Sequence, residues 1–132
     1  MEQKKFVHTE RVALRWGDMD AMGHVNNTVY FRCMEQARIG WFEALLPQGQ
    51  AWKGTGIVIV SASCNFRRPI NYPGTVEVKL SVGAPGRSSV PTFYELLIGE
   101  QLYADGAAVV VFIDMQTQKP VRIPERIRPL LQ

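Results

Sequence analysis

The chain has 132 residues, of which 46% are hydrophobic and 20% are charged, and its formal net charge is +3. This length is that of a single domain over residues 1–132, and the composition is typical of a folded protein rather than a disordered one. The small positive charge suits an anionic small ligand. The chain carries no lysine run and no motif of a nucleic-acid-binding fold, so we expect no nucleic-acid partner.

The N-terminal residues and the cysteines indicate where the protein works. Residues 1–6 lack the apolar region of a secretory signal peptide, and no apolar stretch approaches the ~18 residues of a transmembrane helix. Cys33 and Cys64 are the only cysteines in the sequence, and their spacing does not fit a metal site. We therefore expect a cytoplasmic protein with two buried, reduced thiols, no membrane partner and no bound metal.

The first elements are a strand, a loop and a helix. Apolar and polar residues alternate over 11–16, which predicts a half-buried strand, and the glycines of 17–23 predict a loop. Asn26 and Asn27 are good N-cap residues, so we expect the helix to begin near Thr28.

The expected helix runs to about Leu46, where Pro47 and Gly49 end it. Its apolar residues recur at helical spacing, and most of its charged residues lie opposite. A helix with such a wide apolar face packs against a sheet. The central stripe of this face consists of Tyr30, Met34, Ala37, Trp41 and Leu45.

Turn residues and alternating patterns predict four further strands, followed by a short basic tail. Pro91 lies inside the third of these and predicts an edge strand or a bulge there. One strand, one long helix and four antiparallel strands make an α+β domain in which one sheet buries one helix. Such a sheet keeps an exposed edge or face, so we expect a homo-oligomer. The four predicted strands cover residues 57–68, 75–82, 88–98 and 102–114.

Residues 16–27 read Trp-Gly-Asp-Met-Asp-Ala-Met-Gly-His-Val-Asn-Asn. This stretch resembles the signature of the acyl-CoA thioesterases related to 4-hydroxybenzoyl-CoA thioesterase, in which an aromatic residue, two acids and a glycine lead into the central helix. Residues 30–38, 86–89 and 114–124 resemble other parts of the same family, so the resemblance covers nearly the whole chain. It implies the hotdog fold, an antiparallel sheet of about five strands wrapped around one long central helix.

Carried over by position, the resemblance makes Asp20 the catalytic carboxylate and the backbone N–H of Asn27 the donor that polarises the thioester carbonyl. Gly23 matches the glycine of the bend between them. His24 is a second base, a ligand of polar substrate atoms, or a loop histidine held by hydrogen bonds. The expected contacts to substrate and coenzyme A are Val25, Asn26, Arg67, Arg68, Arg87, Ser88 and Ser89.

The residues of this loop also suit the chemistry on physical grounds. Thioester hydrolysis needs an activated water or a nucleophile, which a carboxylate provides, and it needs donors for the oxyanion, which a helix N-terminus provides. The scheme needs no metal and no resident cofactor, since coenzyme A is part of the substrate. Asp20 has a structural alternative, the capping of loop amides, and we expect Asp18 to orient the loop. Another branch of the fold uses a helix glutamate, but Glu35 is expected on the polar face, away from the helix start.

The sequence therefore predicts a thioester hydrolase that converts acyl-CoA to free acid and coenzyme A. Two alternatives remain open: a thioesterase that uses acyl carrier protein as donor, and an acyl-CoA-binding protein without catalysis. The expected assembly is a homodimer or homotetramer, with coenzyme A in a groove at a subunit interface and its phosphates met by arginines.

Overall fold

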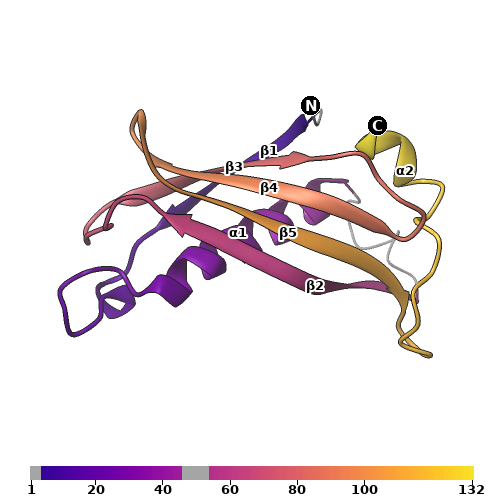
Figure 1. The fold of residues 1–132 in the computed structure, drawn as a ribbon, viewed down its shortest axis with the longest axis horizontal. Helices are drawn as coiled ribbons and strands as arrows, with labels where there is room; N and C mark the ends of the chain where they lie inside the picture. Colours follow the sequence, from indigo (N-terminus) through magenta and orange to yellow (C-terminus); the bar gives the residue numbers. More distant parts are fainter. Residues whose placement is uncertain (1–3, 46–53) are drawn as a thin grey trace.

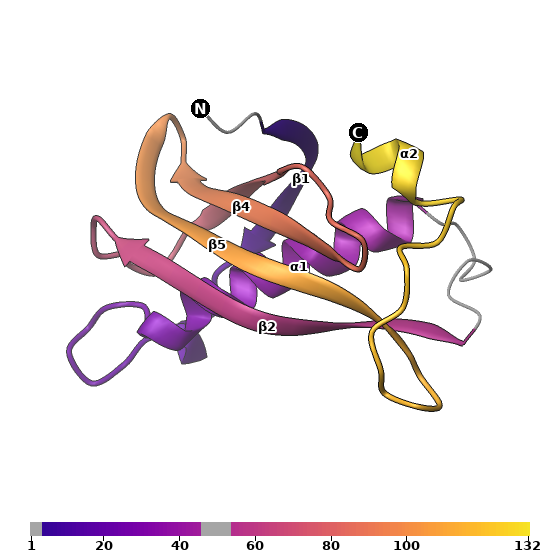
Figure 2. The same cartoon turned by 45° about the vertical axis from the view of Figure 1, so that its right-hand side comes forward.

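The structure is a computed structural model that describes residues 4–45 and 54–132. Its strands form one antiparallel sheet in the order β1-β3-β4-β5-β2, which wraps around the long helix α1 (Figures 1 and 2). This arrangement confirms the predicted α+β hotdog fold. The elements are β1 (Lys5–Ala13), the 3-10 helix η1 (Trp16–Asp18), α1 (Asn27–Leu45), β2 (Thr55–Phe66), β3 (Thr75–Val82), β4 (Ser89–Ile98), β5 (Gln101–Asp114) and α2 (Arg128–Leu131).

The first strand differs from the prediction. It begins at Lys5 and ends at Ala13, whereas Trp16 starts η1 and is 78% exposed. The Asp18 carboxylate accepts a hydrogen bond from the Arg15 amide (2.8 Å), which turns the chain before the strand can continue. The short helix α2 was not predicted either. The expected helix stop at 46–49 lies outside the described residues.

The edge position expected for Pro91 is wrong, because β4 lies inside the sheet between β3 and β5. The carbonyl of Pro91 accepts from the Gly83 amide (2.9 Å), and Gly83 directly follows the last residue of β3. The nitrogen and carbonyl of one strand residue point to the same side, so the proline nitrogen faces the end of β3 rather than β5. An inner strand therefore tolerates this proline because its neighbour stops there.

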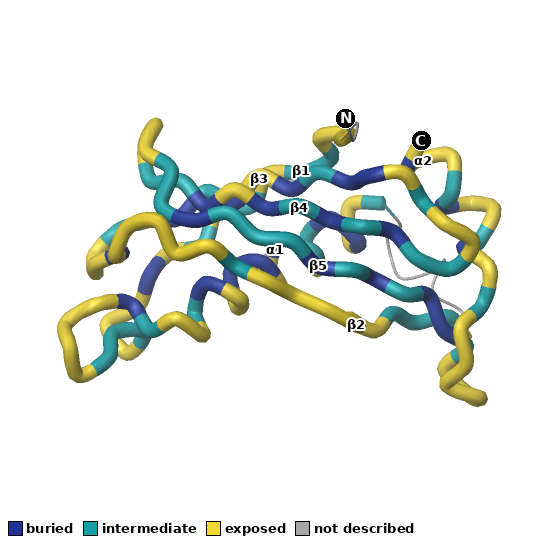
Figure 3. The backbone as a smooth tube through the Cα atoms, viewed as in Figure 1, coloured by how far each residue is buried: buried dark blue, intermediate teal, exposed yellow. Residues whose placement is uncertain are grey.

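The core lies between the sheet and α1, along a row of buried positions (Figure 3). The even-numbered residues of β3 are buried against the helix, which confirms its predicted alternation. The helix stripe is confirmed as well, with Leu45 half-buried and the rest buried. Helix and sheet approach closely where Met34 meets Gly106, since an added Cβ there would lie 2.6 Å from the Met34 Cε. A membrane-spanning helix must be both long and predominantly apolar. In the described part of the chain, no helix is long and apolar enough to cross a bilayer.

A buried tyrosine ties the helix to the segment between β2 and β3. The Tyr30 hydroxyl donates to the Arg68 carbonyl (3.2 Å) and accepts from the Ile70 amide (3.2 Å). The Ile70 carbonyl in turn accepts from the Val25 amide (2.8 Å), just before α1 begins. The helix, the loop that precedes it and the β2–β3 connection therefore hold one another in place.

We expect Tyr30→Phe to lower the free energy of unfolding by about 1–3 kcal/mol, because the buried Ile70 amide loses its acceptor. Urea denaturation measures this change. Tyr72→Phe is the matched control, since Tyr72 is an exposed tyrosine and its replacement should leave the transition midpoint unchanged. Equal midpoints for Tyr30→Phe and the parent protein would show that the hydroxyl does not contribute.

Candidate active site

The loop before α1 is organised by Asp18, as expected. Its side chain is only 11% exposed, and its carboxylate accepts from the Arg15 amide. The Asp18 carbonyl accepts from the Asn26 amide (3.0 Å), and Met19 forms a β-bridge with Val25. These bonds close the loop at its base, so the residues between them project from the end of the molecule (Figure 1).

Asp20 stabilises this projecting loop with one of its two carboxylate oxygens. Its Oδ1 accepts from the amides of Met22 (2.9 Å) and His24 (3.4 Å). This is the structural alternative considered for Asp20. Its Oδ2 has no donor among the described residues. The carboxylate therefore holds the loop and keeps one oxygen for another partner.

Gly23 forms the bend that the sequence predicts. Its φ is +81°, in the left-handed region where glycine carries little strain, and its amide donates to the Asp20 carbonyl (3.1 Å). His24 is held by hydrogen bonding, one of the three roles foreseen for it. With its side-chain amide oriented so that Nδ2 faces the loop, Asn71 donates to His24 Nδ1 (3.0 Å) and to the Gly23 carbonyl (3.1 Å).

At the N-terminus of α1, within the described part of the chain, one backbone amide lacks the hydrogen-bond acceptor that its neighbours have. Asn26 is the N-cap, since its Oδ1 accepts from the Thr28 amide (2.9 Å) and hydroxyl (2.7 Å). The Asn26 carbonyl accepts from the Val29 amide (2.9 Å). The amide of Asn27, by contrast, has no acceptor among the described residues. A free N–H thus stands at the helix start, where the helix macrodipole is positive.

Two grooves flank the exposed side of α1. The β1 groove, of about 460 Å³, lies between α1 and β1, and the β2 groove, of about 300 Å³, lies between α1 and β2. Thr28, Arg32 and Glu35 line both. Asp18 also lines the β1 groove, whereas Asp20 lines neither.

Glu35 lies on the exposed, polar face of α1 and more than a turn beyond its first residue, as expected. It nevertheless lines both grooves together with Thr28, which the sequence did not indicate. Helical spacing carried the signal, because positions i, i+4 and i+7 from Thr28 through Arg32 to Glu35 lie on one face.

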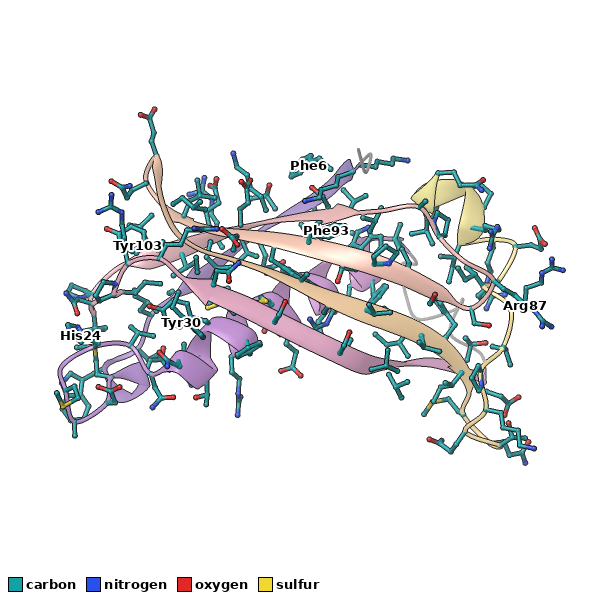
Figure 4. The ribbon with its side chains drawn as sticks, in the orientation of Figure 1. Phe6, His24, Tyr30, Arg87, Phe93 and Tyr103 are labelled. Carbon is teal, nitrogen blue, oxygen red and sulfur yellow. The ribbon has the colours of Figure 1, made fainter. Side chains whose placement is uncertain are left out.

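The arginines expected to bind phosphate fall into two groups. The amides of Arg67 and Arg68 both donate to the Tyr103 carbonyl (3.0 Å each), and Tyr103 lies at the same end of the molecule as His24 (Figure 4). Arg87, followed by Ser88 and Ser89, lies at the opposite end of the sheet (Figure 4). One chain therefore does not bring the two groups together.

The Arg67 guanidinium is oriented by an ion pair with Asp105. Hydrogen bonds from Arg67 and from Asn65 lower the pKa of the Asp105 carboxyl below its usual value. The Arg67 side chain nevertheless remains 53% exposed. Asp105 thus fixes the direction of Arg67 and leaves part of its guanidinium accessible to an anion.

The two cysteines and the possible metal ligands bear on which catalytic groups the site can provide. Burial, followed by the charge of Asp18, raises the pKa of the Cys33 thiol to about 11, and burial also raises that of Cys64 to about 11. Both thiols are protonated at neutral pH, which makes them poor nucleophiles even though Cys33 lines the β1 groove. Across residues 4–45 and 54–132, no three His, Cys, Asp or Glu side chains are grouped as a metal site requires.

Comparison with known proteins identifies the family. The model of the thioesterase-like superfamily matches residues 14–131, and the chain belongs to this superfamily. The uncharacterized protein YsmA of Bacillus subtilis is 30% identical over 118 residues, which cover 88% of this chain and 79% of YsmA. A structure described as a candidate thioesterase of Pseudomonas aeruginosa is 32% identical with a TM-score of 0.89, covering 97% of this chain and all of that one. A Thermus thermophilus thioesterase, solved with coenzyme A and zinc, is 30% identical with a TM-score of 0.83, covering 96% of this chain and 92% of that one.

The resemblance seen in the sequence is thereby confirmed, and the chain is a thioester hydrolase of the hotdog type. The matched region spans the loop, α1 and the strands β2 to β5, and it begins just after β1. Several features of this chain can take part in that chemistry. They are the free amide of Asn27, the carboxylates of Asp20 and Glu35, and the two grooves.

We expect neither thiol of the folded protein to react readily with iodoacetamide near neutral pH, because both are protonated and Cys33 is buried. Mass spectrometry of labelled protein measures this, with the urea-unfolded chain as the reactive control. Labelling should accelerate only as the pH approaches 11. Rapid labelling of Cys33 at neutral pH would contradict the assignment and would reopen a cysteine nucleophile.

Proposed function

We propose that this protein hydrolyses acyl-CoA thioesters to a free acid and coenzyme A. Its superfamily and a relative solved with coenzyme A support this substrate class. The observation that carries the proposal is the Asn27 amide, which starts a 19-residue helix and has no acceptor in the described part of the chain. Coenzyme A enters as part of the substrate, and the proposal includes no resident cofactor.

In this mechanism the thioester carbonyl oxygen binds at the Asn27 N–H. Attack on the carbonyl carbon makes this oxygen negative, and the amide and the helix macrodipole then stabilise it more strongly than in the ground state. Because the Thr28 and Val29 amides are already bonded to Asn26, the oxyanion is directed to Asn27. The tetrahedral intermediate expels the thiolate of coenzyme A, a good leaving group that needs little acid assistance.

Asp20 supplies the base or the nucleophile. Its free Oδ2 either takes a proton from water as that water attacks, or attacks the carbonyl carbon itself to form a mixed anhydride that water then hydrolyses to the free acid. Glu35 is the rival carboxylate, because it lines both grooves that adjoin the helix start. Substitution of each separates the two.

Asp20→Asn retains an oxygen that accepts from Met22 and His24, so the loop should keep its conformation while the base is lost. We expect kcat to fall by about 100-fold or more on every acyl-CoA, and Glu35→Gln to keep most activity. A thiol-release assay measures both. Loss of activity in Glu35→Gln with retention in Asp20→Asn would transfer the role to Glu35.

Asp114→Asn is the matched control. The Asp114 Oδ1 accepts from the Gln116 amide (2.8 Å) and the Thr117 amide (2.9 Å), the same kind of turn that Asp20 makes. It is the last residue of β5 and lines neither groove beside α1, so its replacement should leave kcat unchanged. If this variant also loses activity, the effect of Asp20→Asn is structural.

The amide itself is testable because Asn27 is the first residue of α1. Proline is well tolerated at this position, where it removes the N–H without breaking a helix hydrogen bond. We expect Asn27→Pro to lower kcat by about 100-fold or more with little change in stability, and Asn27→Ala, which keeps the N–H, to retain activity. Comparable kcat values for the two variants would contradict the oxyanion assignment.

We further propose a homodimer formed along β2. This strand is an edge of the sheet, it spans 12 residues, and none of them is charged. Val58, Ile59 and Val60 on it are exposed. The other edge, β1, carries Lys5, Glu10 and Arg11, and edge charges of this kind discourage pairing. Antiparallel pairing of two β2 strands would satisfy the unpaired backbone groups of both.

A two-fold axis across β2 also explains the separation of the arginines. In each chain β2 begins at the Arg87 end and finishes at the loop end (Figures 1 and 4). An antiparallel partner would place its own Arg87 end beside this chain's loop, near Arg67 and Arg68. Coenzyme A would then lie across the subunit interface, with phosphates bound by both chains.

We expect Val60→Lys to convert the dimer to a monomer, since Val60 is 60% exposed on the edge and a lysine there opposes strand pairing. Sedimentation velocity measures the mass, and KM for acyl-CoA should rise in parallel. Val60→Thr is the control, because threonine has the same branched shape and no charge. A dimer that survives Val60→Lys would move the interface elsewhere.

A further inference from the structure

The β2 groove is suited to an acyl chain. It runs along α1 from Thr28, the residue that follows Asn27 in the chain, to Arg38. Phe31 and Met34 of α1 and Ile59 and Ala62 of β2 line it. Ile59 and Ala62 pair with the buried residues Val110 and Ala108 of β5, so they lie on the helix side of the sheet.

An uncompensated cation lies at the far end of this groove. Arg38 is half-buried, its Nη1 donates to the Tyr94 hydroxyl (3.1 Å), and its Cζ lies 5.7 Å from the centre of the Tyr94 ring. A guanidinium has five N–H donors, and the others of Arg38 have no acceptor among the described residues. Glu35, three residues earlier, forms no ion pair with Arg38 in the described part of the chain.

A cation without a counter-charge favours the binding of an anion. A partly buried charge without a counter-charge is unfavourable, and a guanidinium pairs best with a carboxylate in a bidentate geometry. The ionisable side chains of the groove are two arginines, Arg32 and Arg38, and one glutamate, Glu35, which leave one net positive charge. The groove is thus apolar along its walls and positive at its far end.

The length of the groove sets the size of the acyl group. The rise from Asn27 to Arg38 is roughly 16 Å for 11 helical residues. Arginine side chains on a helix lean back toward its N-terminus, so the distance from the amide to the guanidinium is on the order of 10 Å.

We propose that the β2 groove binds the acyl chain and that Arg38 binds a carboxylate at the tip of that chain. The preferred substrates are then coenzyme A monothioesters of straight-chain dicarboxylic acids with about six to eight carbons, whose extended length is comparable to the distance on the order of 10 Å between the amide and the guanidinium. This assignment rests on the proposed function, because it takes the position of the carbonyl from the Asn27 amide. Arg38 contacts only the tip of the chain and determines specificity rather than the rate of bond cleavage.

The test compares substrates that differ only at the tip. We would measure kcat/KM for octanoyl-CoA and for suberyl-CoA, which have eight carbons and end in a methyl group and a carboxylate. We expect about a tenfold or greater preference for suberyl-CoA. Arg38→Met should reverse the preference, and Arg38→Lys, which keeps the charge, should retain part of it. Arg32→Met tests whether any arginine on the groove suffices, and it should leave the ratio near that of the parent protein.

The other possible results contradict either the role of Arg38 or the proposed function itself. If the parent protein hydrolyses octanoyl-CoA as well as suberyl-CoA, and Arg38→Met changes both alike, the specificity role of Arg38 is wrong while the proposed function stands. If no acyl-CoA is hydrolysed, the proposed function itself fails. If Arg38→Met instead separates the dimer in sedimentation, the anion that Arg38 binds belongs to a second copy of this chain, and the proposal is overturned.

Discussion

The N-cap of α1 is the interaction on which the site depends. The side chain and carbonyl of Asn26 take the amides of Thr28 and Val29, which fixes the first residue of the helix and leaves the Asn27 amide without an acceptor. The cap is held in turn from both sides, by the Asp18 carbonyl on the Asn26 amide and by the Ile70 carbonyl on the Val25 amide. A shift of one residue in the helix start would present a different amide to the substrate.

Unused hydrogen-bonding capacity marks the places where a substrate can bind. Most polar groups of the loop bond one another, as folded proteins require of groups shielded from water. Among the described residues, unused capacity is found at the amide of Asn27 and the second oxygen of Asp20, and along the helix at the remaining donors of Arg38. The amide donor complements a thioester carbonyl, the carboxylate acceptor complements an attacking water, and the guanidinium donors complement an anionic chain tip. The groove between α1 and β2 runs from Thr28, the residue after Asn27, to Arg38.

Structural features that depend on local periodicity were predicted correctly from the sequence. The position of Pro91, which depends on a residue distant in the chain, was not. The alternation of β3 and the stripe of α1 were sufficient to place the sheet on the helix, since burial imposes these periods directly. Pro91 was misplaced because the end of β3, not the sequence around the proline, frees its nitrogen. Trp16 is a different case, because Asp18, only two residues further along, turns the chain before the strand reaches it.

The candidate site shows the same division. Gly23 and the capping asparagines were recognised from short motifs, and their geometry is local. The groove position of Glu35 and the distance between His24 and Arg87 follow from how helix and sheet pack, which no motif encodes (Figure 4). The arginines of the two ends would come together only in a dimer of the kind proposed above, and within one chain the uncharged sequence of β2 is the feature that supports such a dimer.

Amide chemical shifts test the central claim most directly. An acyl-CoA analogue with a methylene in place of the sulfur keeps the carbonyl and cannot be hydrolysed. When it is added to the 15N-labelled protein, a carbonyl bound at the start of α1 should move the Asn27 amide proton downfield and leave the Thr28 amide, already bonded to Asn26, nearly unchanged. An unperturbed Asn27 amide in the saturated complex would contradict the proposed mechanism.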